Sequence, residues 1–252
     1  MDIKDLQKNW NQFGKMDPLW SILTSPDKKG NKWDIHEFLA TGEGEIYAAM
    51  EYLKSLGSNV PRRKALDFGC GVGRLTQALA RYFDEVYGVD IAPSMIELAK
   101  KYNRHGDRCR YYLNNTDDLK LFSNNSFDLI YTVITLQHMK PQYSKNYIKE
   151  FLRMLAPHGV LIFQLPSEPI IINETGTINL KELILRLVPR RLLRATYRRM
   201  KYDNQPKMEI YWIKRQEVVE FLERNGAQII DIKQARRPFL HFVNWRYCVT
   251  KK

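Results

Sequence analysis

The sequence predicts a doubly wound α/β domain built on a mostly parallel sheet of seven strands. From residue 62 onward, short β-rich runs alternate with segments of helical periodicity, which is typical of a parallel sheet with helices on both faces. One such run passes directly through a glycine-rich turn into a helix. The 252 residues, 44% of them hydrophobic, suffice for one core of ordinary size with an appended cap, but two full domains would be cramped.

The expected elements follow one another in a regular order. Strands are expected over "KALDFG", "EVYGVD", "CRYYLN", "SFDLIYTVI", "GVLIFQL", "AQIIDIKQA" and "FVNWRYCVT", the fifth of which is expected to end at Pro166. Helices are expected over "GRLTQALARYF", "APSMIELAKKYN", "SKNYIKEFLRML" and "RQEVVEFLERNG". Pro93 marks the start of the second of these helices, and Gly226 closes the last one.

Two segments depart from this alternation and divide the chain. Residues 1–60 are helical and aromatic in pattern and are interpreted as a cap, while residues 61–252 form the α/β domain, with an insert at 167–207. Both segments are candidates to cover the carboxyl ends of the strands, where open α/β sheets bind ligands. Within the cap, "ATGEGEI" resembles a flexible joint, and Trp20, Trp33 and Phe38 are expected to close over a ligand or, alternatively, simply to pack on the core.

Composition narrows the class of protein. No apolar run approaches the roughly 20 residues needed to cross a bilayer, and the amino terminus is charged, which favours a cytoplasmic protein. The three cysteines are widely spaced and contain no CxxC pair, so neither a disulfide framework nor a zinc site is indicated.

The glycine-rich turn lies in "ALDFGCGVGRLTQAL". Gly69, Gly71 and Gly73 leave bare main chain at the start of a helix, where unbonded N–H groups can meet a nucleotide-like ligand. The alternative is a tight turn with no ligand. Arg74 stands where a dinucleotide-binding fingerprint has its last glycine, which disfavours a nicotinamide or flavin cofactor.

Asp90 ends the second expected strand, 17 residues after Gly73. Its two carboxylate oxygens match the two hydroxyl groups of a ribose. The alternative is an N-cap for the following helix, since aspartate is favoured there. The order of glycine turn and carboxylate on successive strands favours ribose binding.

With these two features in place, the chain resembles the class I S-adenosylmethionine-dependent methyltransferases. The resemblance rests on "ALDFGCGVGRLTQAL", "VYGVDIAPSMIELAK", "NNTDDLKLFSNNSFDLIYT", "LQHM" and "YIKEFLRMLAPHGVLIFQLPS", from about residue 64 to 167. It implies a Rossmann-like sheet and S-adenosyl-L-methionine as cofactor. The main chain at Gly69 and Gly71 would face its methionine part, Asp67 would reach its ammonium group, and Asp90 would hold the ribose.

The resemblance also implies contacts further along the cofactor. Ile91 and Met95 would pack on the adenine, and Asn115 stands where the family usually has an aspartate that accepts from the adenine amino group. Which residue of the segment Asn115–Asp117 makes that contact is left open. The complete expected cofactor-binding set is Asp67, Gly69, Cys70, Gly71, Gly73, Asp90, Ile91, Met95, Asn115, Thr116, Asp117, Thr132 and Val133.

His138, in "TLQHMKP", is the candidate catalytic residue. It follows the fourth strand, and its ordinary pKa near neutrality suits a general base toward a hydroxyl acceptor. Alternatively, Gln137 and His138 begin a helix and bond local main chain. Gln137 is also a candidate contact to the substrate. No metal is required for methyl transfer from a sulfonium.

The segment 181–202 is strongly basic and is called here the basic segment. It carries eight Lys or Arg against one acid, in a chain of net charge +12 and pI about 9.5. It is interpreted as an amphipathic helical lid with a solvated outer face, as an anion-binding surface through Arg190, Arg191 and Arg194, or as a surface that contacts an anionic membrane. RNA ranks lower because no RNA-binding module is recognisable, and DNA is not expected.

Together these features predict a methyltransferase that modifies an oxygen or nitrogen of a small metabolite or glycan, with anionic and lipid-linked acceptors among the interpretations. The alternatives are an RNA methyltransferase and a non-catalytic cofactor-binding protein whose basic segment contacts a partner or a membrane.

Overall fold

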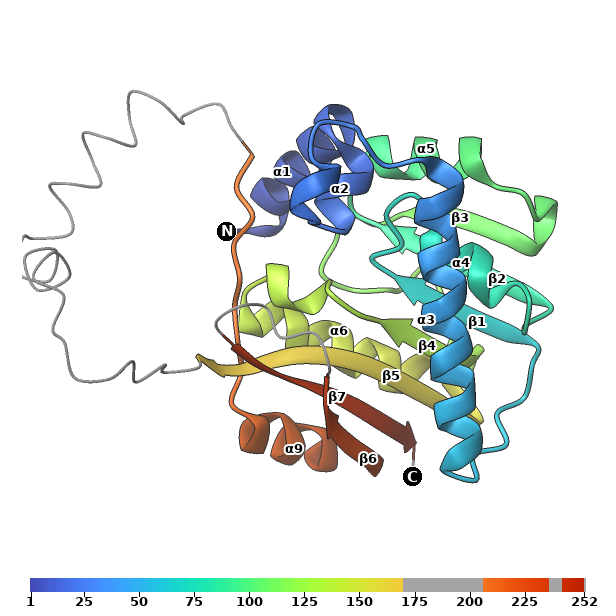
Figure 1. Ribbon diagram of the computed structural model, residues 1–252. Coiled ribbons are helices and arrows are strands. Elements are labelled where there is room, and N and C mark those ends of the chain that lie inside the picture. The colour runs from blue at the N-terminus through green and yellow to red at the C-terminus, as the bar shows by residue number, and fades with distance from the viewer. Residues whose placement is uncertain (170–205, 236–241, 252) are drawn as a thin grey trace, which may run out of the picture.

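A computed structural model describes residues 1–169, 206–235 and 242–251 (Figure 1). The predicted seven-stranded, mostly parallel sheet is confirmed: its strand order is β3-β2-β1-β4-β5-β7-β6, and β7 alone runs antiparallel to its neighbours. The strands are β1 Lys64–Phe68, β2 Glu85–Asp90, β3 Cys109–Leu113, β4 Phe127–Thr132, β5 Leu155–Pro169, β6 Ala227–Gln234 and β7 Phe242–Lys251.

Helices cover both faces of the sheet. The helices are α1 Ile3–Met16, α2 Pro18–Ile22, α3 Ile35–Ser55, α4 Arg74–Leu79, α5 Pro93–Tyr102, α6 Pro141–Met154 and α9 Arg215–Arg224, with short 3₁₀ turns η1 Pro26–Lys28, η2 Gly106–Arg108 and η3 Leu136–His138. Helices α3, α4 and α5 share one hydrophobic core with the sheet, and α6 and α9 share the other. Helices α1 and α2 lie beside α5 (Figure 1).

Helix α4 is shorter than the sequence predicts. It ends at Leu79, and the chain continues through a turn to Phe83, whose side chain is still buried. Two expected features fall outside the described residues. These are the basic segment with its three candidate arginines, Arg190, Arg191 and Arg194, and most of the insert.

The expected flexible joint at "ATGEGEI" is wrong, because α3 runs through it without interruption. A Cβ atom added at Gly42 would lie 2.4 Å from the main-chain oxygen of Arg74, so this glycine lets α3 pack closely against α4. Gly44, two residues later, is exposed and has no atom within 4 Å of an added Cβ. The glycine that looked like a hinge is therefore a contact point between two helices.

The expectation that β5 ends at Pro166 is also wrong, since β5 continues to Pro169. Beyond Phe163, the last residue that pairs with β4, β5 pairs with β7 alone. The Pro166 oxygen accepts from the amide of Ile213, and a residue in a strand points its nitrogen and its oxygen to the same side. The proline nitrogen therefore faces away from β7, and no hydrogen bond between these two strands is lost.

Candidate active site

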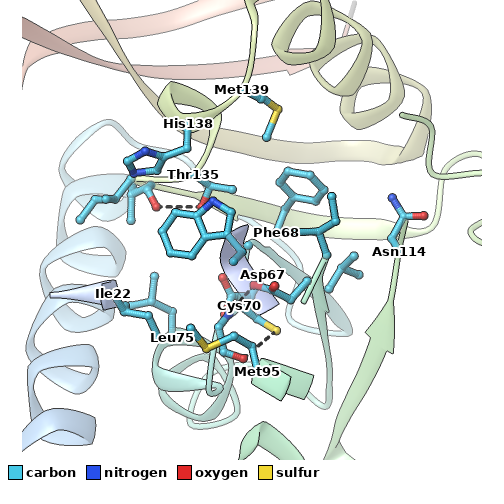
Figure 2. A pocket seen from close by; sticks show the side chains of 18 of the residues that line it. Ile22, Asp67, Phe68, Cys70, Leu75, Met95, Asn114, Thr135, His138 and Met139 are labelled. Atoms are coloured by element: carbon cyan, nitrogen blue, oxygen red, sulfur yellow. Dashed lines mark hydrogen bonds between the residues drawn. The ribbon is translucent and has the colours of Figure 1, made fainter. Parts of the chain in front are cut away.

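A cavity opens at the carboxyl ends of β1, β2 and β4. It encloses about 910 Å³ of empty space, including its open mouth. Figure 2 shows His138 and Met139 across the cavity from Cys70 and Met95. The structure brings together most of the expected cofactor-binding residues here. Those that line the cavity are Asp67, Gly69, Cys70, Gly71, Asp90, Ile91, Met95 and Val133.

The glycine turn forms the floor of the cavity. Gly69 and Gly71 have φ angles of 79° and 53°, in the left-handed region that favours glycine. An added Cβ would lie 2.2 Å from Thr135 Oγ1 at Gly69 and 2.5 Å from Ile22 Cδ1 at Gly71. The amides of Gly69 and Cys70 both donate to the Val89 oxygen, which fixes the turn against β2.

Gly73 has a different role. It is the left-handed N-cap of α4 and does not line the cavity. A Cβ at this position would lie 2.6 Å from the hydroxyl oxygen of Tyr111. For Gly73 the alternative given by the sequence therefore holds: this glycine is needed by the turn itself and not by a ligand.

Asp67 carries a buried carboxyl group into the cavity from the end of β1. It is 1% exposed, and its Oδ2 accepts a hydrogen bond of 2.6 Å from Thr76 Oγ1. Burial raises the pKa of Asp67 to about 7, although the Thr76 hydrogen bond and the charge of Arg74 oppose the shift. A cation placed next to this carboxyl would favour its ionised form.

Asp90 faces the cavity from the end of β2. Its Oδ2 accepts from the Gly71 amide and its Oδ1 from the Ala92 amide, each at 2.8 Å. Burial raises the pKa of Asp90, while these main-chain bonds lower it. Because a carboxylate offers about four lone-pair sites, each oxygen still has room for a ligand hydroxyl. Asp90 therefore braces the glycine turn and remains open to the cavity.

Asn114, on the adenine side of the predicted site, was not predicted from the sequence. Asn114 is buried and lines the cavity, whereas Asn115, Thr116 and Asp117 are exposed and do not. The Asn114 amide donates to the Asp90 oxygen, which continues the pairing of β3 with β2 by one residue. This pairing of β3 with β2 places Asn114 beside Asp90, and it is the only signal for Asn114 because no local sequence pattern marks this residue.

The chain after β4 forms the next wall. Val133, Ile134 and Thr135 line the cavity, but Thr132 is a fully buried strand residue outside it. Ile134 has a φ of 61°, which is rare for a β-branched residue and marks local strain.

His138 lines the cavity but is buried, with 3% exposure. Its Nδ1 lies 2.9 Å from the Glu209 oxygen, and since a carbonyl only accepts, Nδ1 carries the proton. Its Nε2 then bears the lone pair and lies 3.3 Å from the side-chain nitrogen of Gln137. Burial lowers the pKa of His138 to about 4, so the ring is neutral at pH 7. Gln137 is fully buried outside the cavity, and its Oε1 has no partner.

Arg74 is a second site residue that was not predicted from the sequence. Its side chain is buried and lines the cavity, and its Nη2 pairs with Glu45 Oε2 at 3.0 Å. The other Glu45 oxygen accepts from the Tyr131 hydroxyl at 3.3 Å. Arg74 Nε is buried without a partner, which leaves one N–H donor for a ligand. The sequence shows that Arg74 follows the glycine motif, but it does not show that the Arg74 side chain faces the cavity.

Helices α1 and α2 form the roof. Leu6 and Trp10 of α1 line the cavity together with Ser21 and Ile22 of α2. The Trp10 ring centroid lies 5.1 Å from that of His138 in an edge-to-face arrangement.

The aromatic residues expected over the ligand are elsewhere. Trp33 packs edge-to-face on Phe38 with centroids 5.6 Å apart, and Trp20 donates to the Ser25 oxygen. None of these three lines the cavity. The expectation named the wrong aromatics because helical periodicity cannot show which helix crosses the cavity.

Comparison with known proteins identifies the α/β core. Residues 66–163 match a family model described as a methyltransferase domain. This stretch, less than half of the chain, is similar to a methyltransferase domain. The family uses S-adenosyl-L-methionine, and the cavity fits that cofactor: the unpartnered Arg74 N–H suits a carboxylate, and buried Asp67 suits an ammonium group.

Curated relatives match the chain in part. A mitochondrial ubiquinone biosynthesis O-methyltransferase of Schizosaccharomyces pombe is 29% identical over 131 residues, which are 50% of this chain and 46% of that protein. Phosphoethanolamine N-methyltransferase 1 of Caenorhabditis elegans is 26% identical over 137 residues, 54% of this chain and 29% of that protein. The matched region thus spans less than half the length of either relative.

Solved structures resemble this protein over nearly its whole length. Magnesium protoporphyrin IX methyltransferase from Synechocystis PCC 6803, with bound SAH, has a TM-score of 0.63 at 18% identity and covers 99% of this chain and 100% of its own. A SAM-dependent methyltransferase from Leishmania major has a TM-score of 0.66 at 13% identity, covering 99% and 87%. At these identities the likeness shows the fold.

In the described ranges, no group of three or more His, Cys, Asp or Glu side chains is placed to hold a metal ion. Cys70, Cys109 and Cys248 are free and buried, and burial raises the pKa of each thiol. Among helices of the described part, none is long and apolar enough to cross a bilayer.

Proposed function

We propose that this protein is a methyltransferase that transfers a methyl group from S-adenosyl-L-methionine to an oxygen or nitrogen of a small molecule. The observation that carries the proposal is that Asp67, Asp90 and Arg74 line one cavity over the glycine turn. The cofactor supplies an activated methyl group on a sulfonium. The protein's task is then to bind, orient and exclude water, for which positioning alone contributes roughly 7–11 kcal/mol.

Each end of the cofactor has a matching group in the cavity. Asp67 would hold the ammonium group and Arg74 Nε the carboxylate of the methionine part. Asp90 would accept from the ribose hydroxyls, and Ile91 and Met95 supply apolar surface for the adenine. Gly69, Cys70, Gly71, Val133 and Asn114 complete the walls.

His138 would accept the proton of a hydroxyl acceptor at Nε2. The hydrogen bond from Nδ1 to the Glu209 oxygen fixes the tautomer, so the Nε2 lone pair accepts from Gln137 Nε2 at 3.3 Å and would exchange that partner for the acceptor hydroxyl. A base whose pKa is about 4 is weak, so it suits an acceptor hydroxyl that is itself acidic. An amine acceptor that arrives neutral needs no such base.

What we call the acceptor wall consists of four cavity residues: Leu6, Trp10, His138 and Met139. All line the cavity, and none carries a charge at pH 7, because His138 is neutral. A charged group buried against such a wall would lose hydration without compensation. We therefore propose that the acceptor presents an uncharged, apolar end to the reacting methyl group.

Finer assignments rest on the basic segment and on the cap. We propose that residues 1–60 act as a helical cap on the domain 61–252, and that the insert 167–207 contributes to acceptor binding. An anionic part of the acceptor, as in a charged glycan, or a membrane with a lipid-linked acceptor would then meet Arg190, Arg191 and Arg194, with the protein in the cytoplasm.

The proposal is tested in two stages. Calorimetry with S-adenosylhomocysteine first measures cofactor binding, with Asp90→Ala as the variant expected to weaken it. A cell extract is then treated with protein and cofactor, and products that gain one methyl mass are identified. Binding without any product favours the non-catalytic alternative, and methyl incorporation into RNA favours the RNA methyltransferase. Absence of binding contradicts the proposal.

A further inference from the structure

The amino terminus of α5 takes part of its cap from a distant helix. Its N-cap residue, Ala92, offers no side-chain hydrogen bond. The Ser94 amide instead donates to Asn11 Oδ1 at 3.0 Å, and the Ser94 hydroxyl donates to the Asn11 main-chain oxygen at 2.9 Å. Asn11 lies on α1, 83 residues earlier in the chain. A free N–H in the first turn of α5 is therefore satisfied from α1.

A second hydrogen bond joins α1 to the same region. Gln7 Nε2 donates to the Ile91 oxygen at 3.1 Å. Gln7 and Asn11 are four residues apart, so they lie on one face of α1. Together they grip the short turn that connects β2 to α5, which also carries Asp90.

Gly14 extends this face and sets how closely the helices approach. A Cβ atom at Gly14 would lie 2.2 Å from Ser94 Oγ. The added Cβ would also lie 3.2 Å from Ser94 Cβ, so a larger residue would either turn the Ser94 hydroxyl away from Asn11 or separate α1 from α5. Gln7, Asn11 and Gly14 thus form a docking stripe at helical spacing.

We infer that Gln7 and Asn11 are positioning residues of the cofactor site, which hold the turn that presents Asp90 to the ribose. The inference rests on the proposed function, because it assigns a ligand to Asp90. Asp90 accepts one hydrogen bond at Oδ1 from the Ala92 amide and one at Oδ2 from the Gly71 amide. Since Asn11 takes the Ser94 amide, Asp90 keeps its other lone pairs for a ligand.

The same helix also lines the cavity through Leu6 and Trp10. One face of α1 thus fastens the helix to the cofactor turn, while another covers the site. Docking of α1 and binding of the cofactor must then favour each other, because each stabilises the same turn. Helix α1 is a fixed wall of the site in this view, in place of a lid that closes after binding.

The test measures dissociation constants for S-adenosylhomocysteine and for methylthioadenosine, which keeps the adenine and ribose but lacks the amino-acid part. Asn11→Leu removes the side-chain acceptor at similar volume and should weaken both ligands by the same factor, roughly tenfold. Asn11→Asp keeps an acceptor at the helix amino terminus and should restore affinity to within about twofold.

Two control variants separate positioning from general loss of stability. Lys8→Ala changes an exposed residue of α1 and should bind like the wild type. Asp2→Ala removes the side chain that caps α1 through the Asp5 amide, far from Ser94. It should lower the Tm. For each degree of Tm lost, it should weaken ligand binding less than Asn11→Leu does.

The possible outcomes are distinct. The positioning role is overturned if Asp2→Ala and Asn11→Leu weaken ligand affinity equally for each degree of Tm lost. It is also overturned if Asn11→Leu weakens the binding of S-adenosylhomocysteine but not of methylthioadenosine. Failure of Asn11→Asp to restore affinity also overturns it. If the wild type binds neither ligand, the proposed function fails instead.

Discussion

Thr76 of α4 donates its hydroxyl proton to the buried Asp67 carboxyl group of β1, over 2.6 Å. This bond opposes the effect of burial, which raises the pKa of Asp67 from its ordinary 3.8 to about 7. The unfolded chain ionises this carboxyl near pH 4, whereas the folded protein keeps the proton up to about pH 7. Its contribution to the free energy of unfolding therefore falls as the pH rises from 4 to 7.

Cofactor binding should show the opposite trend at Asp67. A ligand ammonium favours the carboxylate, so affinity for S-adenosylhomocysteine should rise between pH 5.5 and 7.5, with release of a proton. Calorimetry in buffers of different ionisation enthalpy checks this. Thr76→Val should raise the midpoint of this pH dependence by about one pH unit, because the hydrogen bond that stabilises the ionised Asp67 carboxylate is lost. If the affinity of the wild type does not change with pH, Asp67 does not bind the ammonium group of the ligand.

Arg74 is expected to discriminate ligands by their carboxylate. Replacing Arg74 alone would leave Glu45 without its ion pair, at a cost of about 3–5 kcal/mol of stability if that pair behaves as fully buried. The double variant Arg74→Gln with Glu45→Gln removes both charges and is the better test. It should weaken S-adenosylhomocysteine by roughly tenfold and methylthioadenosine by much less. Equal weakening of both ligands would assign Arg74 to packing.

His138 should leave a distinctive pH profile. Because burial lowers its pKa to about 4, kcat/KM should show no titration of this group near pH 6.5 and should fall only below about pH 5. His138→Asn should lower kcat by about 10²–10⁴ toward a hydroxyl acceptor and leave the affinity for S-adenosylhomocysteine unchanged. An inflection near 6.5 that disappears in His138→Asn would contradict the buried neutral ring.

Gly42 and Gly44 form a matched pair within α3. Gly44→Ala should raise stability by about 0.5–1 kcal/mol, since the added methyl group meets no atom and the helix gains propensity. Gly42→Ala should lower stability, because its Cβ would collide with the Arg74 main-chain oxygen. Thermal unfolding of the two variants measures both signs. Stabilisation by both would mean that α3 and α4 are not in close contact at Gly42.

The sheet and the cofactor floor could be predicted because their signals are local. The turn Gly69–Gly71 needs glycine φ angles, and the run before it is almost fully buried, as its apolar composition indicates. Asp90 was also predictable, because it ends a strand that neighbours this turn. These inferences needed only short stretches of sequence and known strand order.

The missed features depend on contacts between distant segments. Trp10 and Trp33 are both aromatic residues of the cap, but only the crossing of α1 over the cavity distinguishes them. Gly42 looked like a hinge because its partner, Arg74, is 32 residues away in sequence. The role of Asn114 follows from its pairing with Asp90, which no local pattern reveals.

The buried thiol of Cys70 gives the molecule its own chemical reporter. Alkylating reagents attack thiolates, and burial keeps this thiol protonated and out of contact with solvent. Of the three cysteines only Cys70 lines the cavity. The rate at which Cys70 is alkylated therefore reports how often the cavity opens to solvent. A bound nucleoside would slow that rate at Cys70 relative to Cys109 and Cys248, which makes occupancy measurable by mass spectrometry without any engineered label.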